Sequence, residues 1–254
     1  MKAIGIIGYK KSGKTTLTMA LAESLIKKGH SVAIIKHSSN NIDYGNTDTG
    51  LFMEKASTVA LITPDNSEII FKGQYKLKDI ISHLSEDILL IEGFKSLKYF
   101  PKILCVRNAN DKKELEDDLT LFTAGMDNSL KKNKIANYLI TDESDIEYMS
   151  KQIEENGFLL PDMNCGDCGY KDCYGLARAI MQGKESLEKC EYSFEENFLI
   201  QVNKRKIHLN PFMSKLYQSI LHGMLSPLKD IDSLKNGLIE IKWNPTDNFN
   251  KKNN

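Results

Sequence analysis

The sequence lacks long apolar runs and an excess of charge of either sign. No stretch of about 18 apolar residues occurs in the 254 residues, so we expect no membrane-spanning helix. Lys plus Arg and Asp plus Glu each number 34, and this balance gives no electrostatic reason to expect a nucleic acid or a membrane as partner. The first residues do not have the pattern of a secretory signal. We therefore expect a cytoplasmic protein whose cysteines are reduced or bound to metal.

Apolar periodicity indicates an α/β domain over residues 1–158. Residues 2–7 and 32–35 are short apolar runs typical of strands buried on both faces, and residues 15–28 have the spacing of a helix. Further strands are expected at 58–62, 68–71, 88–91, 103–106 and 138–140, with helices at 77–84 and 142–156. This alternation predicts a mostly parallel sheet with helices on both faces.

The composition changes after Pro161, and we expect three further segments. Residues 159–194 hold four cysteines and form a small domain, and residues 195–245 form a small α+β region. Within that region we expect two short strands in 198–209, a helix that begins at Asn210-Pro211 and ends near Pro227, and a strand at 238–243. Residues 246–254, which read TDNFNKKNN, are expected to be a flexible tail.

A glycine-rich motif follows the first expected strand. Residues 8–15 read GYKKSGKT and match G-x-x-x-x-G-K-[ST], with the strand before and the helix after that this motif requires. A glycine-containing turn that matches by accident is the alternative. We expect Lys14 to reach the β- and γ-phosphates of a nucleotide and the Thr15 hydroxyl to ligate Mg²⁺. The expected nucleotide-binding residues are Gly8, Lys11, Ser12, Gly13, Lys14, Thr15 and Thr16.

An acidic residue is needed on the Mg²⁺ side of such a site. Glu92 ends the strand expected at 88–91, at the same sheet edge as the glycine loop, whereas Asp87 enters that strand from the opposite end. We therefore favour Glu92 as the Mg²⁺ residue, with a solvated strand-end glutamate as the alternative. Asp48, in the loop after the second strand, could hold Mg²⁺ through water or position a nucleophile. The catalytic candidates are thus Lys14, Asp48 and Glu92.

Base recognition is not decided by the sequence. The guanine-reading pattern N-K-x-D is absent, and residues 108–111 read NAND, which has its ends but lacks the lysine. The spacing of the motifs therefore leaves both GTP and ATP open.

Four of the five cysteines lie close together in the sequence. Cys165, Cys168, Cys173 and Cys190 are separated by two, four and sixteen residues. Structural zinc usually takes two short Cys-x2-Cys pairs, whereas three clustered cysteines with a remote fourth favour a [4Fe–4S] cluster; zinc or free thiols are the alternatives. Metal binding would supply the stability that so small a segment lacks. Cys105, in an apolar run, is expected to be a buried core residue.

Three motifs together resemble the MobB family of molybdopterin-guanine dinucleotide biosynthesis adaptors. They are GYKKSGKTTL (8–17), KHSSNNIDYGNTDT (36–49) followed by MEKAS, and DILLIEGFK (87–95). The resemblance covers residues 1 to about 158 and implies a SIMIBI-class P-loop fold, a homodimer, and Mg²⁺-dependent GTP binding with weak hydrolysis. It also implies a guanylyltransferase or target molybdoenzyme as partner. The sequence departs from the family at Ser-Ser-Asn-Asn (38–41), where a histidine-rich acidic run is common.

The cysteine segment carries a second resemblance. CGDCGYKDCYGLARAIMQGKESLEKC is similar to the [4Fe–4S] domain of corrinoid iron–sulfur proteins and of RnfB-type electron-transfer subunits. This resemblance implies a cluster and leaves its task open.

Three functions are consistent with these motifs. The first is a GTP-binding accessory protein of molybdenum or tungsten cofactor maturation, at most a weak GTPase, that carries an iron–sulfur cluster. The second is a nucleotide-gated electron-transfer or metallocluster-maturation protein. In the third, the cysteine domain is a structural staple or oxygen sensor that docks the P-loop domain to an enzyme.

Overall fold

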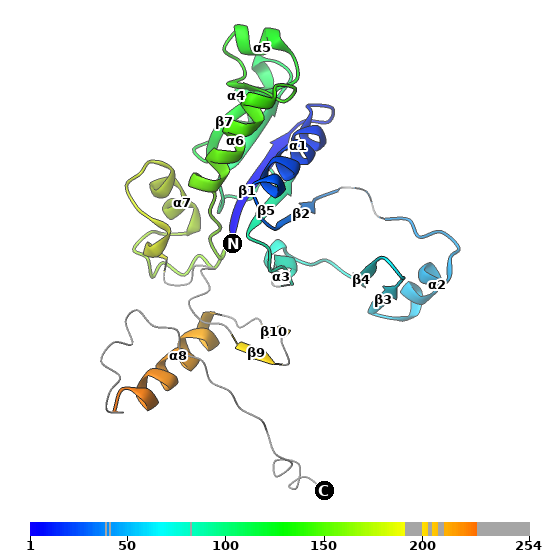
Figure 1. Ribbon diagram of the computed structural model, residues 1–254, viewed down its shortest axis with the longest axis vertical. Coiled ribbons are helices and arrows are strands. Elements are labelled where there is room, and N and C mark those ends of the chain that lie inside the picture. The colour runs from blue at the N-terminus through cyan, green and yellow to red at the C-terminus, as the bar shows by residue number, and fades with distance from the viewer. Residues whose placement is uncertain are drawn as a thin grey trace, which may run out of the picture. The chain divides into compact units, whose positions relative to one another are not determined.

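The computed structural model describes two compact units of the chain, Met1–Glu196 and Asn197–Asn254. The described residues are 1–38, 40, 42–81, 83–190, 200–202, 205–207 and 211–227. Within them, no helix is long and apolar enough to cross a membrane. Figure 1 gives the labels of the elements.

A six-stranded sheet forms the centre of the first unit. The strand order is β2-β5-β1-β6-β7-β8, and every neighbouring pair is parallel. In that order the strands are Val32–Lys36, Ile88–Glu92, Lys2–Gly8, Lys102–Val106, Thr120–Gly125 and Tyr138–Leu139. The continuous apolar runs of β1, β5 and β6 suit strands buried on both faces. The predicted α/β class with a mostly parallel sheet is confirmed.

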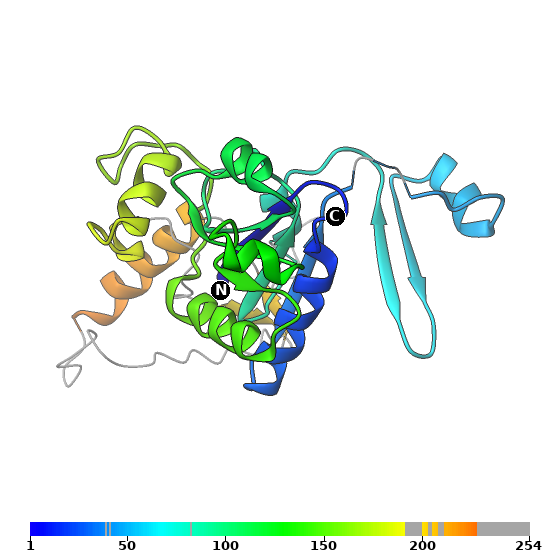
Figure 2. The ribbon, with the colours of Figure 1, turned by 90° about the horizontal axis from the view of Figure 1, so that it is seen from above.

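Two long helices cover one face of the sheet. Helices α1 (Lys14–Lys27) and α6 (Glu143–Asn156) lie side by side (Figure 2). Their buried side chains pack with alternate residues of β1 and β5; the cluster includes Leu17, Leu21, Leu25, Ile146, Met149, Ile153, Ile4, Ile6, Ile88 and Leu90.

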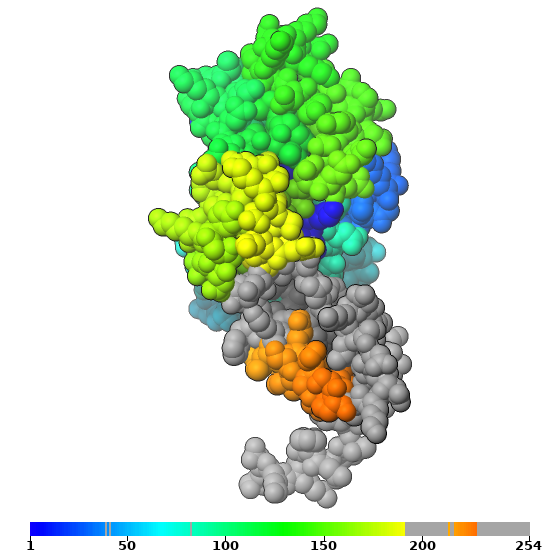
Figure 3. All heavy atoms as spheres, turned by 90° about the vertical axis from the view of Figure 1, so that its left-hand side faces the viewer, coloured from blue at the N-terminus to red at the C-terminus, as the bar shows by residue number. Residues whose placement is uncertain are grey.

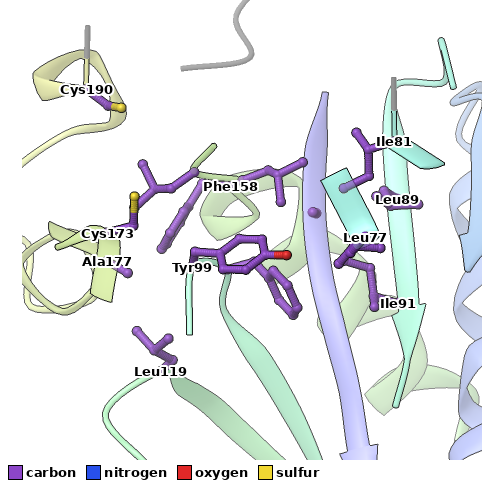
Figure 4. Close-up of a cluster of buried hydrophobic side chains, with 14 of the residues drawn as sticks. Leu77, Ile81, Leu89, Ile91, Tyr99, Leu119, Phe158, Cys173, Ala177 and Cys190 are labelled. Atoms are coloured by element: carbon purple, nitrogen blue, oxygen red, sulfur yellow. The ribbon is translucent and has the colours of Figure 1, made fainter. Parts of the chain in front are cut away.

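The opposite face is covered partly by the cysteine segment. We call residues 159–190 the cysteine module; it contains helix α7 (Cys173–Met181) and a 3₁₀ turn, η1 (Leu187–Lys189). Its apolar residues share one core with α3 (Leu77–Ile81) and with Ala3, Leu89, Ile91, Tyr99, Phe100 and Leu119 (Figure 4). The module therefore lies within the first compact unit and contributes to its surface beside the sheet (Figure 3).

The hairpin of β3 (Thr58–Ile62) and β4 (Ser67–Phe71) corrects one expectation. Both segments are strands, as expected, but they pair antiparallel in a separate two-stranded sheet. Only four residues join them, and the turn is closed by the Thr63 N–H donating to the Asn66 carbonyl. A link this short permits only antiparallel pairing, since parallel strands need a crossover of a dozen residues or more.

Strand β2 corrects a second expectation, which concerns its burial. We expected it to be buried on both faces, but Ile34 is 46% exposed. Because β5 is inserted between β1 and β2, β2 is left at the edge of the sheet. The sequence analysis also missed strand β7 and the short helices α2 (Asp48–Lys55), α4 (Ala109–Leu115) and α5 (Asn128–Lys132).

The second unit contains a short hairpin and one helix in its described part. Strands β9 (Ile200–Val202) and β10 (Arg205–Ile207) pair antiparallel, and α8 spans Pro211–Leu225. These elements agree with the two short strands and the proline-initiated helix expected there. The strand expected at 238–243 and the tail at 246–254 lie outside the described residues.

Candidate functional site

The glycine loop runs from the end of β1 to the start of α1. Gly8 and Gly13 have φ angles of 152° and 89°, and a Cβ at Gly8 would lie 2.5 Å from the Cys105 carbonyl oxygen. Lys11 has a φ of 63°, in the left-handed region that non-glycine residues seldom adopt. This backbone brings the loop into the tight turn at a helix N-terminus that binds phosphate in P-loop proteins.

Lys14 and Thr15 begin the helix and connect the loop to its surroundings. The Lys14 ammonium folds back over the loop and donates to the Tyr9 carbonyl oxygen at 2.8 Å. The Thr15 hydroxyl lies 3.1 and 3.2 Å from the two carboxylate oxygens of Glu92, to which it can donate. Glu92 is only 7% exposed, and Asp87 lies at the opposite end of β5. Hydrogen bonds from the backbone N–H and hydroxyl of Ser31 hold the pKa of Asp87 below its ordinary value.

Ser12 supplies an observation that points to a ligand. Its hydroxyl is buried, and among the described residues it has no hydrogen-bond partner. A buried hydroxyl without a partner is costly. A phosphate oxygen in the loop would supply the missing bond, so the residues present fit a nucleotide phosphate with Mg²⁺ held on the side of Thr15 and Glu92.

The structure does not bring all the candidate residues into this arrangement. Asp48 is the first residue of α2, which Thr47 caps by accepting from the Gly50 N–H, and no described contact joins Asp48 to the glycine loop. Thr16 is exposed at the start of α1 and makes no described side-chain contact with the loop. Roles for Asp48 and Thr16 remain predictions.

The side chains at both ends of the NAND segment (108–111) form hydrogen bonds within the chain. Asn108 caps α4 by accepting from the Asp111 N–H at 2.9 Å. Asp111 is 3% exposed and accepts from Nε and Nη2 of Arg107 at 2.7 and 2.9 Å. The hydrogen bonds from Arg107 hold the pKa of Asp111 below its ordinary value. Both ends of the segment are thus already engaged within the chain.

Sequence reasoning missed the residues that surround Tyr9. The Lys95 ammonium lies 4.0 Å from the centroid of the Tyr9 ring, and the Arg107 guanidinium carbon lies 5.3 Å from it. The Tyr9 hydroxyl donates to Glu114 at 2.5 Å. The signal for Lys95 was its place in the DILLIEGFK motif, three residues after Glu92; nothing in the sequence pointed to Arg107 or Glu114.

The four clustered cysteines differ in their burial. Cys173 and Cys190 are buried in the core shared with the sheet (Figure 4). Cys168 is half-buried against that core, and Cys165 is exposed. Cys105 is also buried, as expected. Burial raises the pKa of the Cys173 thiol, whereas hydrogen bonds from the backbone of Asn164 and Met163 favour its thiolate.

The cysteine module fits an iron–sulfur group by its donors and its backbone. Thiolates are the ligands that such clusters use, and Gly166 and Gly169, which follow Cys165 and Cys168, have φ angles of 83° and 84° that turn the loop sharply. No three His, Cys, Asp or Glu side chains in the described part of the chain converge as a metal site. The ligand assignment to Cys165, Cys168, Cys173 and Cys190 therefore rests on donor chemistry and remains a prediction.

Comparison with known proteins identifies the family. The family model for "Molybdopterin guanine dinucleotide synthesis protein B" (MobB) matches residues 3–125. A Methanocaldococcus jannaschii protein described as "Putative molybdopterin-guanine dinucleotide biosynthesis adapter protein" is 30% identical over 249 residues, which are 95% of this chain and 97% of that protein. The chain belongs to the MobB family. The "Molybdopterin-guanine dinucleotide biosynthesis adapter protein" of Haemophilus influenzae is 34% identical over 112 residues, 41% of this chain and 62% of the relative.

A solved MobB structure shares the fold of about three fifths of the chain. The crystal structure of Bacillus subtilis MobB has a TM-score of 0.51 and 20% identity, and the match covers 60% of this chain and 98% of that one. The likeness confirms a MobB-type P-loop α/β fold.

The cysteine module has its own family match, and a further relative matches about a quarter of the chain. A family model described as "Putative Fe-S cluster" matches residues 160–192. A component of the ion-translocating oxidoreductase complex of Buchnera aphidicola is 33% identical over 69 residues, 26% of this chain and 41% of that protein. This MobB-family chain therefore carries an iron–sulfur-type segment; the closer likeness to corrinoid proteins and RnfB, and the [4Fe–4S] type, remain predictions.

Proposed function

We propose that this protein is a GTP-binding accessory protein of molybdenum or tungsten cofactor guanine-dinucleotide biosynthesis that carries a [4Fe–4S] cluster. The observation that carries the proposal is the buried Ser12 hydroxyl, which has no partner among the described residues. The Lys14 ammonium over the same loop and the Thr15 hydroxyl, 3.1 Å from Glu92, support it. Family membership supports the pathway, because the relatives are described as adapters of this biosynthesis. Its partners would be the guanylyltransferase or a target molybdoenzyme.

Several groups of the loop would bind the phosphates, each in a different way. The N–H groups at the start of α1 and the Ser12 hydroxyl donate to phosphate oxygens, and Lys14 leaves the Tyr9 carbonyl to neutralise negative charge. Thr15 and Glu92 would hold Mg²⁺, which neutralises charge shared between the phosphates. Asp48 begins α2 and has no described contact with this site. We expect at most weak hydrolysis, as the resemblance to the MobB family implies.

A homodimer is the assembly that we propose for this adapter. The α2–β3–β4 region exposes large apolar side chains, with Leu51, Phe52, Ile62 and Ile69 each more than half exposed. Leu51 and Phe52 lie on α2, and Ile62 and Ile69 lie on the hairpin. Where such side chains form one contiguous patch, the patch marks an interaction surface. Light scattering of the purified protein would measure its mass, and a monomer at micromolar concentration would contradict the proposal.

One observation favours the second candidate function, nucleotide-gated electron transfer or metallocluster maturation. Cys173 and Cys190 belong to the same core as residues of β5, the strand that ends at Glu92. A change at the nucleotide could therefore reach the cluster. Measuring the reduction potential with and without nucleotide tests this function, and identical potentials would remove its support.

Anaerobic purification followed by analysis of iron, acid-labile sulfide and bound nucleotide tests the main proposal. We expect about four iron and four sulfide per chain, as a [4Fe–4S] cluster contains, together with guanine nucleotide. Zinc without sulfide would refute the cluster. Adenine nucleotide would refute the guanine assignment.

A further inference from the structure

The segment between β5 and β6 joins the glycine loop to the cysteine module. Residues 93–101, which we call the connecting segment, follow Glu92 directly and end at β6. Its start is fixed by the Gly93 N–H, which donates to the Ile6 carbonyl at 3.0 Å. Phe94 has a φ of 52° and lies against the His37 ring, with a centroid distance of 4.4 Å.

The near end of the connecting segment places a second lysine on the glycine loop. The Lys95 ammonium lies over the ring of Tyr9, while the Lys14 ammonium lies on the carbonyl of the same residue. Burial lowers the pKa of Lys95, and repulsion from Lys14 lowers it further. Among the described residues, no carboxylate forms an ion pair with Lys95.

Two ammonium groups lie beside one loop residue, and their charges attract an anion. An oligophosphate between them would neutralise both charges and relieve their repulsion, and hydrogen bonds from charged donors to phosphate are among the strong ones. Lys95 is 4.0 Å from the ring at the motif's second position, whereas the Thr15–Glu92 pair defines the Mg²⁺ side. Lys95 is therefore placed to contact the phosphates directly, apart from the Mg²⁺ side of the site.

The far end of the connecting segment faces the cysteine module. The Lys98 ammonium lies 4.6 Å from the centroid of the Tyr174 ring in α7, and the Tyr99 carbonyl accepts from the Leu160 N–H at 2.9 Å. Residues 96–99 and the module together line an open pocket of about 530 Å³, and Cys173 is among its lining residues.

A second connection runs through a buried ion pair. The Lys95 carbonyl accepts from the ammonium of Lys102, which is fully buried and pairs with Asp117 at 3.0 Å. The next residue, Asp118, accepts from the Tyr174 hydroxyl at 3.0 Å and pairs with Arg178 at 2.8 Å. Movement of Lys95 toward a phosphate would thus be transmitted to α7 by the chain itself and by this network.

We propose that Lys95 is a phosphate-binding residue and that its engagement by a nucleoside triphosphate tightens the connecting segment against the cysteine module. This inference rests on the proposed nucleotide binding and adds a residue and a consequence to it. Coupling between two sites is reciprocal, so the state of the module changes triphosphate affinity by the same factor as the triphosphate changes the module.

The test compares Lys95→Met with Lys98→Met in the full chain purified anaerobically. Both changes remove an ammonium from the connecting segment and keep an apolar stem, but only the first faces the glycine loop. Calorimetry with GTP and Mg²⁺ should show affinity about 10- to 100-fold weaker for Lys95→Met, the loss of one charged hydrogen bond. Lys98→Met, which loses only a contact with the module, should show a clearly smaller loss. Lys95→Arg should retain most of the affinity, and circular dichroism confirms that each variant folds.

Hydrogen exchange measures the consequence at the module. Saturating GTP should slow amide exchange in residues 160–181 of the wild type and have little effect there in Lys95→Met at equal saturation. Equal GTP affinities for the two methionine variants, or module exchange that GTP leaves unchanged in the wild type, would overturn the inference while nucleotide binding stands. A wild type that binds no nucleotide would overturn the proposed function as well.

Discussion

Glu92 and Asp87 lie at opposite ends of one strand and have different neighbours. It is buried within reach of the Thr15 hydroxyl, whereas Asp87 is held by Ser31 at the other end of β5. Glu92→Gln keeps the shape and removes the charge, so we expect GTP binding in Mg²⁺ to weaken about tenfold, the loss of a charged contact, with little change in EDTA. Titration calorimetry measures both conditions.

Asp87→Asn is the matched control for this prediction. It removes a carboxylate from the same strand, away from the phosphate loop, and should leave the Mg²⁺ dependence of binding unchanged. If the two variants lose Mg²⁺ dependence equally, Glu92 has no special role.

Cys105 is chemically distinct from the cysteines of the module. Burial raises the pKa of its thiol to about 12, so almost no reactive thiolate exists at neutral pH. After metal removal in the folded protein, we expect iodoacetamide to modify the exposed Cys165 at least about 100-fold faster than Cys105, because the Cys105 thiol is buried and almost entirely protonated. Peptide mass spectrometry over a time course gives the rates, and comparable rates would contradict the burial of Cys105.

At the scale of elements, local pattern predicted the helices and strands that have a strong apolar periodicity. The β1–α1–β2 unit follows from periodicity and from the loop motif. Strand β7 was missed because its Thr120–Gly125 run has no strong apolar pattern; it is fixed by pairing with β6. The edge position of β2 could not be predicted either, because it depends on β5, more than fifty residues away, inserting beside it.

The contact between α1 and α6 gives a pH prediction. Glu154 on α6 interacts with His30 at 2.7 Å and Lys28 at 3.0 Å. The His30 hydrogen bond and the charge of Lys28 lower the pKa of Glu154 from its ordinary value of 4.5. A depressed acid pKa stabilises the fold above the unfolded-state value, and this contribution is lost as pH falls through the folded-state value.

Glu154→Gln should therefore cost about 1 kcal/mol near pH 7, the scale of a partly exposed ion-pair network. The difference in unfolding free energy between variant and wild type should shrink below pH 4.5. Urea unfolding at several pH values measures it. A difference that stays constant down to pH 3 would show that the charge of Glu154 does not stabilise the contact.

At the scale of the whole first unit, the cysteine module forms part of the covering of the sheet. Its residues Leu176, Ala177 and Cys173 are buried with Tyr99 and Phe100, so loosening the module exposes the core of the P-loop domain. We expect the unit to unfold in one transition, and its unfolding temperature to fall when the metal is removed anaerobically. The fall should be about 2–4 °C for each kcal/mol of unfolding free energy lost. Calorimetry would contradict this if residues 1–158 unfolded at an unchanged temperature.

Part of the site could be predicted from sequence, and part depended on folding. The glycine loop could be predicted because its residues match a known motif. Glu92 could be predicted as a candidate because it lies at the carboxyl end of an expected strand. Lys95 and Arg107 meet at Tyr9 only after β5 and β6 align beside β1. The shared core of sheet and module was also missed, because a change of composition at Pro161 indicates a boundary and says nothing about packing across it.

The central claim is that the loop from Gly8 to Thr15 binds guanine nucleotide. Calorimetric titration of GTP and ATP into the anaerobically purified protein with Mg²⁺, for the wild type and Lys14→Ala, tests it most directly. We predict a clear preference for GTP in the wild type. For Lys14→Ala we predict a loss of roughly 100-fold or more, because a charged phosphate contact disappears while the helix remains intact. No GTP binding, a preference for ATP, or undiminished binding by Lys14→Ala would contradict the claim.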